Sequence, residues 1–248
     1  MRICIKYILM LLLFFTSFVT AELHSDIYIN PVHSINDWLD KPIEISEKSG
    51  VIEAITADWF LGLSLKDPDN VEDVIEVNNC RELMSAYLAG RRGINYREQL
   101  TVVNLMMVCH TLEIASKLEP AKVSYLDNIV LDMHFAKISP ASLGLQISRE
   151  DIEKASKLET WNDFGKFERV KVRSEHSASY YDHMKGIQNA TIVATGDFDG
   201  DGIEDLVLYV SNSLIEGSYR SYHIYVLTRD SEGAKLILID EPNLLGSY

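Results

Sequence analysis

From about residue 166 onward, apolar and polar residues alternate along the chain. In "ERVKVRSE", Val170 and Val172 fall on one face, and Lys171 and Arg173 fall on the other. A period of two residues is typical of a β-strand. Four more β-rich runs follow, separated by turn residues: "ATIVATG", "DLVLYVSN", "SYHIYVLTR" and "KLILID". The connections are too short for crossover helices, so the sequence predicts an antiparallel meander.

The preceding half of the chain is predicted to be helical, with a hairpin of two helices at its centre. Each helix opens on an asparagine cap, with a glutamate three positions later, and glycines separate the two helices. Cys80 and Cys109 stand almost equidistant from this turn, which would bring them face to face. We therefore predict a Cys80–Cys109 disulfide that adds about 3 to 4 kcal/mol in the chain-entropy model. Two free buried thiols are the alternative.

The predicted fold class is α+β, with a disulfide-linked helical hairpin in the N-terminal half and an antiparallel β-meander in the C-terminal half. Residues 22–160 would form a mainly helical region and residues 161–248 the sheet, or the two would form one continuous domain, 22–248. Within the helical region, Trp59 and Phe60 are expected in the core.

Residues 1–21 are predicted to be a signal peptide. Arg2 and Lys6 precede an almost uninterrupted apolar run, and Val19-Thr20-Ala21 supplies the small-residue pattern for cleavage. An uncleaved N-terminal anchor is the alternative. The expected protein is exported, periplasmic or extracellular, with no membrane insertion after cleavage. The net charge of the whole chain, −14, argues against a nucleic-acid partner and permits a cation or a basic protein.

A run of aspartates, "GDFDGDGIEDL", leads into one of the predicted strands. Asp197, Asp199, Asp201 and Asp205 occupy positions 1, 3, 5 and 9 of a loop, and Ile203 supplies the carbonyl at position 7. This order of oxygen ligands wraps a calcium ion in EF-hand loops. Position 12 lacks the bidentate glutamate, and strands flank the loop, so weak binding is expected, about 10⁻⁴ to 10⁻³ M. The alternative is a hairpin whose aspartates serve turn geometry alone.

Residues Gly196 to Leu206 resemble the calcium loop of FG-GAP and VCBS-type repeats. The resemblance implies that Asp197, Asp199, Asp201 and Asp205 hold Ca²⁺. It covers a single copy, whereas those families usually carry several copies that form a propeller, so neither a propeller nor an adhesive role is implied.

No hydrolase or nucleotide-binding motif of the HExxH, GxSxG, P-loop or GxGxxG type occurs. The most polar cluster outside the aspartate loop is His176, Asp182 and His183, which is expected in an exposed loop. Three functions therefore stay open. The first is a non-catalytic, calcium-stabilised binding or structural module for an unknown protein or glycan partner. The second is an acidic inhibitor or immunity-type protein for a basic partner, and the third is a divergent hydrolase built around His176, Asp182 and His183.

Overall fold

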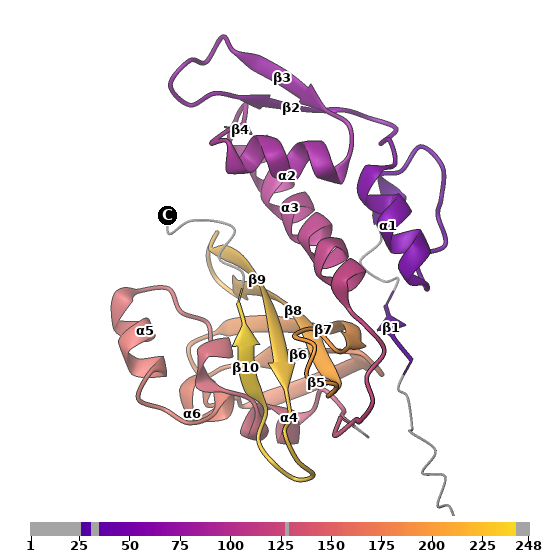
Figure 1. Ribbon diagram of the computed structural model, residues 1–248. Helices are drawn as coiled ribbons and strands as arrows, with labels where there is room; N and C mark the ends of the chain where they lie inside the picture. The colour runs from indigo at the N-terminus through magenta and orange to yellow at the C-terminus, as the bar shows by residue number, and fades with distance from the viewer. Residues whose placement is uncertain (1–25, 31–34, 127–128, 242–248) are drawn as a thin grey trace, which may run out of the picture.

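The computed structural model describes residues 26–30, 35–126 and 129–241 (Figure 1). The predicted signal peptide, residues 1–21, lies outside the described residues. A seven-stranded antiparallel sheet forms the C-terminal half, in the order β10-β9-β8-β7-β6-β5, with β1 pairing with β7. The strands are β1 (Tyr28–Ile29), β5 (Arg169–Ser174), β6 (Ser177–Tyr181), β7 (Gly186–Gly196), β8 (Asp205–Leu214), β9 (Arg220–Thr228) and β10 (Ile237–Asp240). Consecutive strands are neighbours, so the predicted meander is confirmed.

Both faces of the central strands are buried. Val207 and Tyr209 of β8 pack into a cluster with the N-terminal helices, whereas Leu206 and Leu208 pack into a second cluster on the opposite face. This division follows from the alternation of side chains along a strand. Helices therefore cover the two faces of the sheet, and the first cluster contains residues of both halves of the chain.

Four helical elements of the N-terminal half contribute to the cluster that contains Val207 and Tyr209: η1 (Ile35–Asp37), α1 (Lys48–Thr56), α2 (Cys80–Leu88) and α3 (Tyr96–Lys117). As expected, the Asn79 and Asn95 side chains cap α2 and α3 by accepting hydrogen bonds from the backbone three residues later. The Cys80–Cys109 disulfide joins these two helices, and both cysteines are fully buried. The predicted disulfide-linked hairpin is thus confirmed.

Three further helical elements contribute to the opposite side of the sheet: α4 (Met133–Ile138), η2 (Ala141–Leu143) and α6 (Trp161–Gly165). A fourth, α5 (Arg149–Ala155), packs against η2 and α6 through Ala155. Trp161 of α6 is fully buried in the second cluster. None of the helices in the described part of the chain is both long and apolar enough to cross a membrane.

Two features of the N-terminal half differ from the expectation. A three-stranded sheet, in the order β3-β2-β4, lies within the region predicted to be mainly helical. Its strands are β2 (Leu63–Lys66), β3 (Val74–Val77) and β4 (Arg92–Gly93). The prediction for Phe60 is wrong, since its side chain is 61% exposed, whereas Trp59 is buried as expected.

Candidate metal centre

The aspartate loop connects β7 to β8 and is built on two glycines. Gly200 and Gly202 have φ angles of +85° and +86°, a backbone conformation that side chains with a Cβ rarely adopt. The Asp197 carboxylate contacts both glycines: its two oxygens accept hydrogen bonds from the amides of Gly200 and Gly202 at 2.7 and 2.9 Å. The glycines and the first aspartate therefore set the course of the loop.

The other three aspartates also accept backbone hydrogen bonds. Asp199 accepts from the Asp201 amide at 3.2 Å, and Asp201 accepts from the Ile203 amide at 2.7 Å. Asp205 accepts from the Phe198 amide at 2.8 Å. Each carboxylate thus has a role in turn geometry, and each retains a second oxygen or lone pair for another partner.

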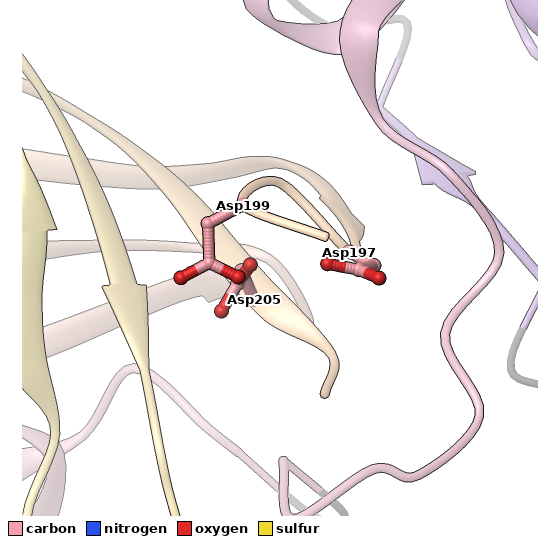
Figure 2. A group of neighbouring side chains, drawn as sticks. All are labelled: Asp197, Asp199 and Asp205. Atoms are coloured by element: carbon pink, nitrogen blue, oxygen red, sulfur yellow. The ribbon is translucent and has the colours of Figure 1, made fainter. Parts of the chain in front are cut away.

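Three of the predicted ligands lie together. Asp197, Asp199 and Asp205 each offer one carboxylate oxygen, and these oxygens lie within 4.8 Å of one another. Figure 2 shows the side chains of Asp199 and Asp205 close together, with Asp197 beside them on the same loop. Asp201 is exposed and stands outside this group, and Ile203 is half-buried. Ligation through Asp201 and through the Ile203 carbonyl stays a prediction.

Asp205 is the most deeply buried of the four carboxylates, with 1% of its surface exposed. Its Oδ1 atom is buried without a hydrogen-bond partner, and so is Oγ1 of Thr228, at the end of β9. The pKa of Asp205 is raised to about 6, chiefly by burial; the charges of Asp199 and Asp201 also raise it, whereas the Phe198 amide and the neighbouring Thr228 hydroxyl lower it. A buried carboxylate oxygen without a partner is costly.

These features fit a hard cation. The donor set contains oxygen atoms only, which favours calcium or magnesium over zinc or copper. A cation at Asp205 Oδ1 would supply the missing partner and would neutralise the repulsion between neighbouring carboxylates. The residues of the aspartate loop are therefore suited to bind the calcium ion that the resemblance implies.

A segment distant in sequence holds both ends of the loop. Residues 119–123, here called the bracing segment, follow directly after α3, and their backbone pairs with the loop. Glu119 and Asp197 exchange two hydrogen bonds, at 3.0 and 2.8 Å. At the other end, the amides of Lys122 and Val123 donate to the Gly202 carbonyl at 2.8 and 3.1 Å. No local sequence pattern indicates this pairing, because backbone hydrogen bonds between distant segments require no particular residue type.

Glu204 is a further buried acid that the ligand pattern did not identify. It is 7% exposed, and its carboxylate accepts from the Thr195 hydroxyl at 2.6 Å. Its amide donates to the Val123 carbonyl at 2.8 Å, so Glu204 is bound to both β7 and the bracing segment. Spacing could not identify it, because position 8 supplies no ligand in the calcium-loop pattern.

The structure separates the polar cluster on which the hydrolase hypothesis depends. Residues 177–181 form strand β6 rather than the expected loop, with His176 before it and His183 after it. His176 packs against Tyr28, with ring centroids 4.6 Å apart, whereas His183 Nδ1 lies 3.1 Å from the Gly165 carbonyl. Asp182 accepts hydrogen bonds from the Met184 and Gly186 amides. The three side chains therefore have separate structural contacts.

Comparison with known families matches residues 189–227 to the FG-GAP repeat. This segment contains most of β7, the whole aspartate loop, β8 and most of β9. No curated protein and no solved structure matches the chain. The resemblance inferred from Gly196 to Leu206 is confirmed: the part of the chain that carries the aspartate loop is similar to a single FG-GAP repeat.

Proposed function

We propose that this chain is an exported, non-catalytic binding or structural module whose aspartate loop holds calcium. FG-GAP repeats are generally binding modules rather than enzymes, and they often bind calcium. The observation that carries the proposal is the partnerless, buried Oδ1 of Asp205 within a group of three carboxylates. The buried disulfide supports export, because disulfides persist in oxidising compartments.

In this proposal calcium joins the two halves of the molecule. The ion fixes the loop, the loop pairs with the bracing segment, and the bracing segment continues from α3. Lys48 of α1 adds a contact at the same place, since its Nζ donates to the Leu118 carbonyl at 2.8 Å and pairs with Glu119 at 2.6 Å. Calcium would thereby hold the helices against the sheet and keep one surface ordered for a protein or glycan partner.

Hydrogen exchange of individual backbone amides tests this role. The amides of Lys122 and Glu204 donate across the contact between the loop and the bracing segment. We expect both to exchange at least tenfold more slowly in 10 mM calcium than in EGTA. The Asp73 amide, which donates to Asn70 in a turn near β3, is the matched control and should not change. Equal exchange of Lys122 and Glu204 in the two conditions would refute the proposed role.

A further inference from the structure

Arg229 is a buried cationic side chain with no ion-pair partner in the described part of the chain. It follows the last residue of β9 and is 9% exposed, although arginine is seldom buried unless it is paired. Its Nε donates to the Ala234 carbonyl at 2.7 Å, and Nη1 donates to the Tyr125 carbonyl at 3.1 Å. Among the described residues, no acidic side chain forms an ion pair with Arg229, and Nη2 has no hydrogen-bond partner. Part of the guanidinium is therefore left to bind something else.

This arginine lines a cavity of about 200 Å³ beside α4. Four apolar residues line one part of the cavity: Ile129, Val130, Phe135 and Ile138. Two further polar residues line it. The Asp132 carboxylate caps α4 by accepting from the His134 and Phe135 amides, and His134 itself is exposed. The cavity thus combines a guanidinium that is only partly engaged in hydrogen bonds with several apolar side chains, which is the usual composition of a small-ligand site.

A planar guanidinium matches a carboxylate better than it matches a spherical anion, because its N–H groups align with the two carboxylate oxygens. The apolar wall requires that the rest of the ligand be hydrocarbon. The negative charge of Asp132 disfavours a multiply charged anion such as phosphate in the same space. Together these features favour a small monocarboxylate with a short apolar body.

We propose that the Arg229 cavity binds a small apolar monocarboxylate, with its carboxylate on the Arg229 guanidinium and its hydrocarbon part against Val130, Phe135 and Ile138. This cavity shares no residue with the carboxylate group of the aspartate loop, and the proposal does not rest on the calcium role. Arg229 would hold the carboxylate, and the α4 side of the cavity would limit the size of the ligand.

The test uses isovalerate and its neutral isostere isovaleramide as probes, in saturating calcium, with NMR titration of the Arg229 side-chain N–H. Isovalerate should shift this signal saturably, with at least tenfold higher affinity than isovaleramide, and inorganic phosphate should bind more weakly than isovalerate. Equal binding of isovalerate and isovaleramide, or no saturable shift with isovalerate, would overturn the proposal.

Two variants locate the site. Arg229→Gln should reduce isovalerate affinity at least tenfold and leave the weak binding of isovaleramide unchanged. Because this change also removes backbone hydrogen bonds and could prevent folding, Val130→Trp serves as the second variant. Val130 is 45% exposed, so the larger side chain can fill the mouth of the cavity with little effect on the core. Isovalerate binding that survives in folded Val130→Trp at the parent affinity would contradict the assignment.

Discussion

Glu119 and Asp197 exchange both of their backbone hydrogen bonds, although 78 residues separate them along the chain. Asp197 is the first carboxylate of the aspartate loop, and Glu119 is the first residue of the bracing segment after α3. The geometry of the candidate metal centre is therefore linked directly to the disulfide-bonded helices. Changes in the loop should be measurable as changes in how the two halves of the protein hold together.

The bracing segment can be weakened through a single hydrogen bond. Lys122→Pro removes the amide that donates to the Gly202 carbonyl at 2.8 Å. Loss of this bond should lower the free energy of unfolding by about 1 to 3 kcal/mol, because the carbonyl loses a partner. Urea denaturation in calcium measures the effect, and Lys122→Ala, which keeps the amide, should stay within about 0.5 kcal/mol of the parent. A loss of equal size in both variants would assign the effect to the lysine side chain instead.

Asp205→Asn should have opposite effects with and without calcium. In EGTA the variant should be more stable than the parent by roughly 1 to 2 kcal/mol, since it removes a buried charge and places a donor near the Thr228 hydroxyl. In 10 mM calcium the parent should gain about 1.4 to 2.7 kcal/mol through ligand binding, for a dissociation constant of about 10⁻⁴ to 10⁻³ M. The variant should gain almost nothing.

Thermal melting of the parent and of Asp205→Asn, in EGTA and in 10 mM calcium, measures which of the two proteins is more stable in each condition. Asp230→Asn removes the same charge from an exposed position beyond β9 and serves as the control. It should follow the parent in both conditions. An Asp205→Asn variant that is less stable than the parent in EGTA would mean that the Asp205 carboxylate is needed for the turn itself.

These sites differ in how far the sequence predicted them. The carboxylates of Asp197, Asp199 and Asp205 could be found because ligand spacing within one loop is a local pattern. The bracing segment could not, since backbone pairing between distant segments imposes no residue type or period on either of them. Arg229 likewise carries no signal in the sequence, because its burial depends on contacts with distant parts of the chain, such as Tyr125.

The same distinction applies to the fold. Strands β7, β8 and β9 were predicted from their β-branched and alternating residues, and the hairpin of α2 and α3 from its caps and glycines. Strand β6, "SASYY", was missed because small and aromatic residues follow one another there without alternation. Strand β4 has only two residues, too few to produce a period. Phe60 was misplaced because hydrophobicity alone does not distinguish the buried Trp59 from its exposed neighbour.

The disulfide should contribute strongly to stability. Cys80 and Cys109 are 29 residues apart in sequence, and a loop of this length contributes about 3 to 4 kcal/mol in the chain-entropy model. The double variant Cys80→Ala, Cys109→Ala should lose at least that amount in urea denaturation, because it also removes two buried sulfur atoms. Addition of a reductant should lower the stability of the parent and leave that of the variant unchanged. A parent that is insensitive to complete reduction would contradict this expectation.

His110 should make stability depend on pH. Burial lowers its pKa below the ordinary value of about 6.5, and Lys117 lowers it further, against the raising influence of Glu113 on α3 and Asp240 on β10. The unfolded state therefore binds a proton more readily, and the free energy of unfolding should fall as the pH decreases below about 6.5. Above this value the stability contribution is fully present.

Urea denaturation of the parent and of His110→Leu between pH 8 and pH 5 isolates this effect on the free energy of unfolding. The leucine variant removes the titrating ring, whose Nε2 is buried without a partner. The difference in stability between parent and variant should shift in favour of the variant as the pH falls through 6.5. A difference that stays constant across the range would show that the pKa of His110 is the same in the folded and unfolded states.

Direct measurement of calcium binding is the most decisive experiment. Isothermal titration of the oxidised protein with calcium should show one site per chain, with a dissociation constant of about 10⁻⁴ to 10⁻³ M. Asp199→Asn retains an oxygen that can accept from the Asp201 amide but loses the charge, so it should bind at least tenfold more weakly, whereas Asp230→Asn should match the parent. If the parent binds no calcium up to 10 mM, or if Asp199→Asn binds as tightly as the parent, the aspartates shape the turn and hold no ion.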